Sequence, residues 1–214
     1  MPATEQRDSP PAPRPVSDVG ADQQPNAALN LPNLITLSRF VLSLVLFYLI
    51  DVGNHWLASA VLFVVAASTD FLDGYIARRY GLVTKVGRIL DPFVDKVIVG
   101  GAFLFLAMYR DQGSGVNAWM VFTVIGREMF VTSLRSVLEQ EGKDFSAVMS
   151  GKIKMVVQCA AVTGSLLFLE YGPGSSSEQT LVIARDVLLW GSVAITLYSG
   201  YEYVIRAVRM FRGG

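Results

Sequence analysis

The sequence predicts an all-α integral membrane protein with six transmembrane helices. Hydrophobic residues make up 52% of the 214 residues and the mean hydropathy is +0.43, which is high for a soluble fold. After residue 29, apolar runs recur with lengths of about 20 residues, the length needed to cross a hydrocarbon core roughly 30 Å thick. The expected helices cover residues 31–50, 56–80, 90–109, 116–138, 151–171 and 180–210.

The segment before the first helix has a different composition. Residues 1–28 hold six of the nine prolines among small and polar residues, with almost no large apolar side chains. Such a segment cannot bury enough apolar surface to fold. We therefore expect a disordered cytoplasmic tail at 1–28, followed by one six-helix transmembrane domain at 29–214.

The expected helices differ in the charges that they carry. The first contains Arg39, an uncharged stretch at 52–69 covers most of the second, and the fourth contains Arg127 and Glu128 within an apolar run. Lipid would not solvate these charged side chains. They are therefore expected to face the interior of the bundle or an aqueous cavity.

The connections between the helices show a charge asymmetry. The outer connections, with turn sequences at 109–113 and 172–175, have only Arg110 and Arg185 near them. The inner segments carry most of the cations: Arg78, Arg79, Lys85, Arg88, Lys143, Lys152, Lys154, Arg206, Arg209 and Arg212. By the positive-inside rule, both termini and the loops after the second and fourth helices are cytoplasmic. We expect a multi-pass protein of the cell (inner) membrane with its functional site on the cytoplasmic side.

Four aspartates bracket the short loop between the second and third helices. Asp70 and Asp73 are three residues apart and Asp91 and Asp95 are four apart, so each pair lies on one face of its helix. Two carboxylates about 5 Å apart repel by roughly 3 kcal/mol at an effective dielectric constant of about 20, so four together require cations. Because all the ligands are hard oxygens, Mg²⁺ or Mn²⁺ is favoured over zinc. Two ions that share carboxylates are typical of displacement at phosphorus, so we predict a two-ion site for phosphate chemistry.

Small and basic residues accompany the acids. Gly74 and Ala77 share the helix face of the first acidic pair, so they leave room for a nucleotide base or a pyrophosphate beside the backbone. Arg78 supplies a fork of donors for phosphate oxygens, and Gly87 lets the third helix begin close to a ligand. A single aspartate would be better explained as a helix-end charge near the lipid headgroups. Four on converging faces favour a site.

The segment from Asp70 to Asp95 resembles the signature of the CDP-alcohol phosphatidyltransferase family, D-x2-D-G-x2-A-R-x8-G-x3-D-x3-D, and every fixed position matches. The resemblance implies a six-helix bundle with the signature on the second and third helices. It implies that Asp70, Asp73 and Asp91 hold the metal ions, and that Asp95 both contacts a metal ion and acts as general base, with Asp91 beside it in the catalytic centre. The CDP group would be bound by Asp73, Gly74, Ala77, Arg78 and Gly87.

Further segments resemble one branch of this family, the phosphatidylglycerophosphate synthases. These segments are 30–39, 126–128, 133–135 and 151–154. The resemblance implies transfer of the phosphatidyl group from CDP-diacylglycerol to sn-glycerol 3-phosphate, giving phosphatidylglycerophosphate and CMP. The cations suited to grip the acceptor phosphate are Arg127, Arg135, Lys152 and Lys154.

Three alternatives stay open at this point. Two lie within the family: a CDP-dependent cardiolipin synthase and a phosphatidylinositol phosphate synthase. The third is a cation transporter, which would tend to place its acids near the membrane midplane on broken helices. The predicted partners are CDP-diacylglycerol, glycerol 3-phosphate and membrane lipids. Nucleic acid is not predicted as a partner, because Lys+Arg 18 balance Asp+Glu 18, and a homodimer is as compatible with the sequence as a monomer.

Overall fold

The structure is a computed structural model that describes residues 31–80, 85–140 and 149–212. Within these ranges, the side chains of residues 31–33, 70–80, 85–89, 91 and 212 lie outside the description. The tail predicted at residues 1–28 lies outside the described residues as well.

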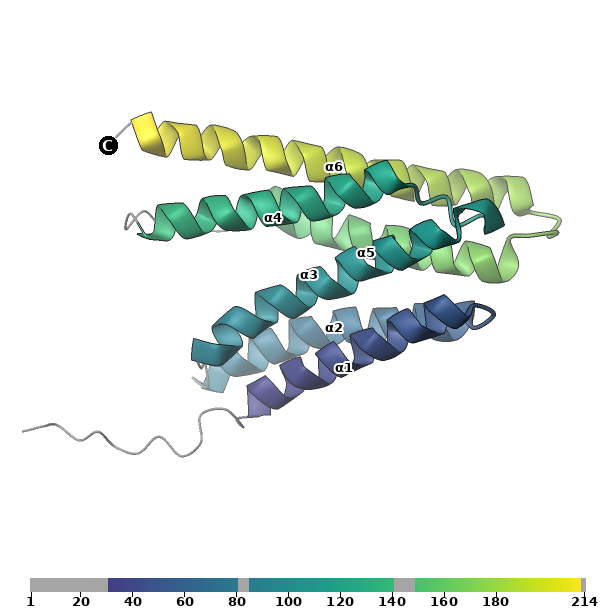
Figure 1. Ribbon diagram of the computed structural model, residues 1–214, viewed down its shortest axis with the longest axis horizontal. Helices are drawn as coiled ribbons and strands as arrows, with labels where there is room; N and C mark the ends of the chain where they lie inside the picture. Colours follow the sequence, from purple (N-terminus) through teal and green to yellow (C-terminus); the bar gives the residue numbers. More distant parts are fainter. Residues whose placement is uncertain (1–30, 81–84, 141–148, 213–214) are drawn as a thin grey trace, which may run out of the picture.

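Six long α-helices make up the described part of the chain (Figure 1). They are α1 (Leu31–Val52), α2 (Trp56–Tyr80), α3 (Lys85–Met108), α4 (Ala118–Gln140), α5 (Met149–Tyr171) and α6 (Glu178–Arg212), with the short 3-10 helix η2 (Arg110–Gln112) between α3 and α4. The described ranges of the chain contain no strand. The predicted all-α class is confirmed, and each of the six expected helices is present.

Three of the described helices have the length and composition of membrane spans. Within the described residues, the stretches Leu34–Val52, Met149–Tyr171 and Glu178–Phe211 are long and apolar enough to cross a membrane, and Trp56–Thr69 forms a shorter apolar stretch in α2. Large apolar side chains point outward on the bundle; Phe122, for example, is 69% exposed. Water would not favour so much exposed apolar surface, whereas hydrocarbon does. The fold is that of an all-α membrane protein.

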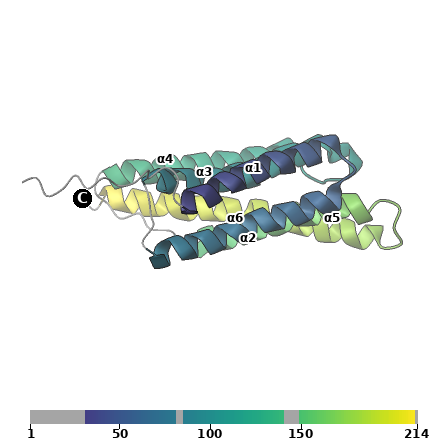
Figure 2. The same ribbon diagram turned by 90° about the horizontal axis from the view of Figure 1, so that it is seen from below.

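The contacts between the helices form a closed ring, and Figure 2 shows the helices lying lengthwise along one common axis. Helix α1 packs against α2 and α3, α2 against α5, α5 along α6, α6 against α4, and α4 against α3. Helix α3 also contacts α5 across the ring. Helices α1, α3 and α5 begin at the end of the bundle where α2, α4 and α6 finish, at the left of Figure 1. This shared end carries most of the cations that the sequence assigns to the cytoplasmic side.

The Phe47 side chain of α1 packs directly on Gly101 of α3. A Cβ atom at Gly101 would lie 2.2 Å from Cζ of Phe47, so no larger residue fits there without movement. The Phe47 ring stacks on Phe105 with ring centroids 5.1 Å apart. Because α1 and α3 run in the same direction, this contact brings Arg39 of α1 level with Asp95 of α3, about two turns nearer to the helix starts.

The largest difference from the predicted boundaries is at the start of α3. The helix begins at Lys85, five residues before the predicted start at 90, and Pro92 lies inside it. The prediction followed hydropathy, which marks where a chain enters hydrocarbon and not where its backbone becomes helical. The charged first turn of α3 can be helical in the headgroup region, where lysine and arginine side chains reach water.

Candidate active site

A cavity of about 600 Å³ opens between α3, α4, α5 and α6. It lies near the start of α3 and α5 and the end of α4, as its lining from those helices shows. The charged residues of the lining are Asp95, Lys96, Arg127, Glu128, Arg135, Glu139, Lys152 and Lys154. Cations outnumber acids, so the cavity favours an anionic ligand.

All four cations that the sequence suggested for an acceptor phosphate line this cavity. Arg127 and Arg135 come from α4, and Lys152 and Lys154 come from the first turns of α5. The side chains of Arg127 and Lys154 are only 9% and 8% exposed, whereas Lys152 is exposed. Cations buried at this depth are costly unless they have partners, so each must be compensated by the protein or by a ligand.

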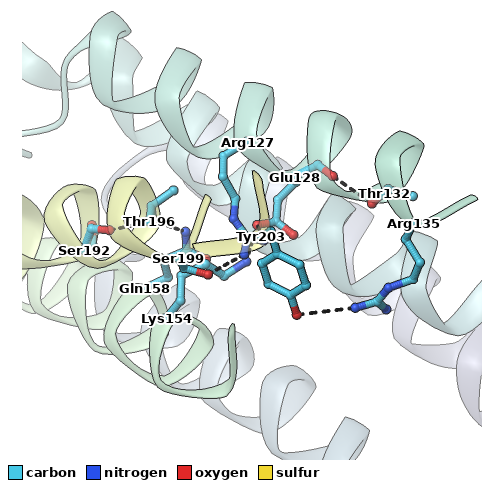
Figure 3. A network of polar contacts seen from close by, with 10 residues as sticks. All are labelled: Arg127, Glu128, Thr132, Arg135, Lys154, Gln158, Ser192, Thr196, Ser199 and Tyr203. Atoms are coloured by element: carbon cyan, nitrogen blue, oxygen red, sulfur yellow. Dashed lines mark hydrogen bonds and ion pairs between the residues drawn. The ribbon is translucent and has the colours of Figure 1, made fainter. Parts of the chain in front are cut away.

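Glu128 compensates part of this charge. Arg127 donates from Nη1 to Oε1 of Glu128 at 2.9 Å, and Lys154 forms an ion pair with the same carboxylate oxygen (Figure 3). A shared carboxylate reduces the repulsion between the two cations, which would otherwise separate them. The side chain of Glu128 therefore holds a cation from α4 and one from α5 together at the cavity wall.

Polar side chains of helix α6 contact the two arginines of α4 (Figure 3). Ser199 accepts a hydrogen bond from Nη2 of Arg127, and the Tyr203 ring lies under the same guanidinium with 5.2 Å between Cζ and the ring centroid. Arg135 donates to the Tyr203 hydroxyl at 3.4 Å. One turn further into the bundle, Gln158 of α5 donates to Oγ1 of Thr196 at 2.9 Å. The polar network thus joins α4, α5 and α6 inside the bundle.

Asp95 lies on the α3 wall of the cavity and has a buried partner. Arg39 of α1 forms an ion pair with its Oδ1 atom; Arg39 is only 1% exposed and the Asp95 side chain is 25% exposed. The expectation that Arg39 faces the interior is confirmed. Because a buried charge without a partner is strongly destabilising, this pair fixes both side chains in place.

The remaining members of the acidic constellation have side chains outside the described residues. The backbone places Asp70, Asp73, Gly74, Ala77 and Arg78 in the last turns of α2, and Gly87 and Asp91 in the first turns of α3. Four residues separate the two helices, so both sets lie at the end of the bundle where the cavity opens. The two-ion site stays a prediction.

Reasoning from the sequence missed several residues of this network: Arg39, Lys96, Glu128, Gln158, Thr196, Ser199 and Tyr203 as site residues. For Arg39 and Glu128 a signal was present, because an intramembrane charge is by itself a marker of function. For α6 the signal was the spacing of Ser192, Thr196, Ser199 and Tyr203, which places four polar side chains on one helix face.

These features define a class: an all-α membrane protein whose cation-rich cavity lies beside an acidic helix pair. The model of one protein family, described as CDP-alcohol phosphatidyltransferase, matches residues 29–198. The chain belongs to this family. The resemblance inferred from the signature is confirmed.

Three bacterial relatives are similar to this chain over most of its length. A Bacillus subtilis protein named CDP-diacylglycerol–glycerol-3-phosphate 3-phosphatidyltransferase is 37% identical over 188 residues, which cover 81% of this chain and 93% of the relative. A Rickettsia typhi protein of the same name is 34% identical over 176 residues, covering 81% and 94%. A Mycobacterium tuberculosis protein named probable phosphatidylglycerophosphate synthase is 35% identical over 191 residues, covering 86% and 84%. The similarity extends over nearly the full length of each relative.

Proposed function

We propose that this protein transfers the phosphatidyl group of CDP-diacylglycerol to sn-glycerol 3-phosphate, releasing phosphatidylglycerophosphate and CMP. The observation that carries the proposal is the cavity in which Asp95 and the four cations Arg127, Arg135, Lys152 and Lys154 lie together. The names of the relatives support the same acceptor.

The cavity suits a small phosphorylated alcohol. Its volume of about 600 Å³ is typical of small-molecule sites. Arginine and lysine donors bind phosphate oxygens through charge-assisted hydrogen bonds, and the fork of an arginine can bind two oxygens at once. A phosphate held by Arg127 and Arg135 leaves a three-carbon chain to extend towards the α3 wall, where Asp95 lies.

Asp95 is the proposed general base. Its carboxylate accepts the proton of the acceptor hydroxyl while that oxygen forms a bond to the lipid-side phosphorus of CDP-diacylglycerol. The bond between this phosphorus and the bridging oxygen breaks, and CMP leaves with the electron pair. The ion pair with Arg39 holds the Asp95 carboxylate in one position, which general base catalysis requires.

Members of the family generally depend on divalent metal ions. The proposed ligands are Asp70, Asp73, Asp91 and Asp95, an all-carboxylate donor set that suits two Mg²⁺ or Mn²⁺ ions. When bound, the ions neutralise charge on the pyrophosphate. Gly74, Ala77, Arg78 and Gly87 are proposed to shape the CDP pocket beside them.

The proposed location is the cytoplasmic face of the cell (inner) membrane. The acceptor and CMP are both water-soluble, so the cavity must open to an aqueous compartment. The cations of the inner segments lie at the same end of the bundle as the cavity, and this end is cytoplasmic by the positive-inside rule.

The proposal is tested by CMP release from CDP-diacylglycerol by the purified protein in detergent with Mg²⁺. Glycerol 3-phosphate, phosphatidylglycerol and inositol phosphate are compared as acceptors. Release with glycerol 3-phosphate alone supports the proposal. Release with phosphatidylglycerol or inositol phosphate instead would assign the protein to a sister activity, and the absence of release with all three would contradict a transferase.

A further inference from the structure

Helix α6 presents a row of buried polar side chains to the cavity region. Ser192, Thr196, Ser199 and Tyr203 follow one another at spacings of four, three and four residues, so they share one helix face. Ser192, Thr196 and Ser199 are fully buried, and Tyr203 is 2% exposed. The segment that matches the family model ends at residue 198, so Ser199 and Tyr203 lie beyond it.

Two members of this row contact the arginines of the cavity. Arg127 donates to the Ser199 hydroxyl and its guanidinium lies over the Tyr203 ring, while Arg135 donates to the Tyr203 hydroxyl at 3.4 Å. Tyr203 also reaches the start of α5, where a Cβ atom at Gly151 would lie 3.3 Å from its hydroxyl oxygen. One side chain from α6 therefore touches both helices that supply the four cations.

The chemistry of these partners differs from that of Glu128. A carboxylate orients a cation but also cancels its charge, whereas a hydroxyl or an aromatic ring orients a guanidinium and leaves the charge in place. Arg127 shares the Glu128 carboxylate with Lys154, so Ser199 and Tyr203 orient its guanidinium without cancelling the charge that remains. Tyr203 likewise orients Arg135 without cancelling its charge. Long arginine side chains lose rotamer freedom when they bind a ligand, and partners that hold them beforehand reduce this cost.

We propose that Tyr203 and Ser199 are positioning residues that set the geometry of Arg127 and Arg135 for the acceptor phosphate. Affinity for the acceptor thus depends on a helix that carries none of the four cations. This inference rests on the proposed function, because it takes these arginines as the acceptor site. The competing explanation is packing alone, since Tyr203 also contacts the small apolar cluster of Val131, Leu138 and Ala207.

The test compares three variants with a matched control. Tyr203→Phe removes only the hydroxyl, Ser199→Ala removes the other hydroxyl, and Tyr203→Leu removes both hydroxyl and ring. The control is Tyr201→Leu, on the same helix but 65% exposed. For each variant we would measure KM for glycerol 3-phosphate, KM for CDP-diacylglycerol, kcat, and competitive inhibition by inorganic phosphate, which reports on the phosphate site without the rest of the acceptor.

The expected result is a selective loss of phosphate affinity. Tyr203→Leu should raise KM for glycerol 3-phosphate and the inhibition constant of phosphate by the same factor, about tenfold, and each single-hydroxyl variant by about threefold. These effects are smaller than the roughly 10-fold to 150-fold loss expected when a direct hydrogen bond to a charged group is removed, because Tyr203 and Ser199 act through the arginines. The kcat and KM for CDP-diacylglycerol should stay within about twofold, and Tyr201→Leu should match the wild type in all four quantities.

Other results separate this inference from the proposed function. Parallel changes in both KM values, kcat and thermal stability would show that Tyr203 acts only in packing and would overturn the inference. An unchanged KM for glycerol 3-phosphate in all three variants, together with a raised KM in Arg127→Gln, would also overturn it and leave the proposed function intact. If Arg127→Gln also leaves KM for glycerol 3-phosphate unchanged, the proposed acceptor site is wrong, and so is the inference that depends on it. Where Tyr203→Leu does not fold, the two single-hydroxyl variants decide.

Discussion

Replacing Arg127 by glutamine perturbs the proposed acceptor site most directly. The side chain of Arg127 is 9% exposed and contacts Glu128, Ser199 and the Tyr203 ring. Glutamine retains the length of the first part of the side chain and some hydrogen bonding, but it removes the positive charge. In this variant the ion pair with Lys154 becomes the main compensation for Glu128, which draws that lysine towards the carboxylate and away from an acceptor phosphate.

The magnitude follows from the contacts that are lost. A hydrogen bond to a charged group contributes about 1.5–3 kcal/mol. At about 1.4 kcal/mol for each factor of ten, the loss of one such bond to the acceptor phosphate lowers kcat/KM for glycerol 3-phosphate by roughly 10-fold to 150-fold. The altered pairing of Lys154 should place the effect in the upper part of this range.

Steady-state CMP release with varied glycerol 3-phosphate provides the assay. Arg209→Gln is the matched control, because Arg209 is an exposed cation of α6 that is not part of the cavity lining. The control should retain the wild-type kcat/KM. A kcat/KM for Arg127→Gln within twofold of the wild type would refute the assignment of this arginine to the acceptor phosphate.

Three further predictions concern the base, the packing and the metal ions. Asp95→Asn should reduce CMP release by about 10²-fold to 10⁴-fold, the contribution typical of a general base, and near-normal turnover would contradict the role of Asp95; because the variant also loses the ion pair with Arg39, its thermal unfolding temperature should fall, so turnover is measured well below that temperature. Gly101→Val should lower the thermal unfolding temperature, since a Cβ there meets Phe47 at 2.2 Å and overpacking typically costs about 1–3 kcal/mol; Gly191→Ala, where nothing lies within 4 Å, is the control, and equal unfolding temperatures would disprove the close packing. Treatment with EDTA should abolish CMP release and added Mg²⁺ or Mn²⁺ should restore it, whereas full activity in EDTA would exclude the proposed metal dependence.

Hydropathy was sufficient to predict the helices of this protein. Each apolar run of about 20 residues became one helix, because backbone groups in hydrocarbon must satisfy their hydrogen bonds within the segment. Hydropathy did not predict the start of α3 at Lys85, because the first residues of this helix are not an apolar run. At the membrane surface a helix can continue without apolar residues, so hydropathy does not mark its end.

Four of the five described cations that line the cavity could also be predicted from the sequence, and Lys96 could not. Arg127 stands in an apolar run, and Arg135 follows at a spacing that keeps it on the same helix face. The residues that contact these arginines could not be predicted from the sequence. Ser199 and Tyr203 are separated from Arg127 by more than seventy residues of chain, and only the packing of α4 on α6 brings them together. A pattern on one helix does not specify which neighbour its polar face meets.

The identity of the lipid product shows most directly which reaction this protein catalyses. The purified protein is incubated with CDP-diacylglycerol, Mg²⁺ and ¹³C-labelled glycerol 3-phosphate, and the lipids are analysed by mass spectrometry alongside the CMP released. We expect labelled phosphatidylglycerophosphate in an amount equal to the CMP released. Release of CMP without any labelled lipid, or no reaction at all, would contradict it.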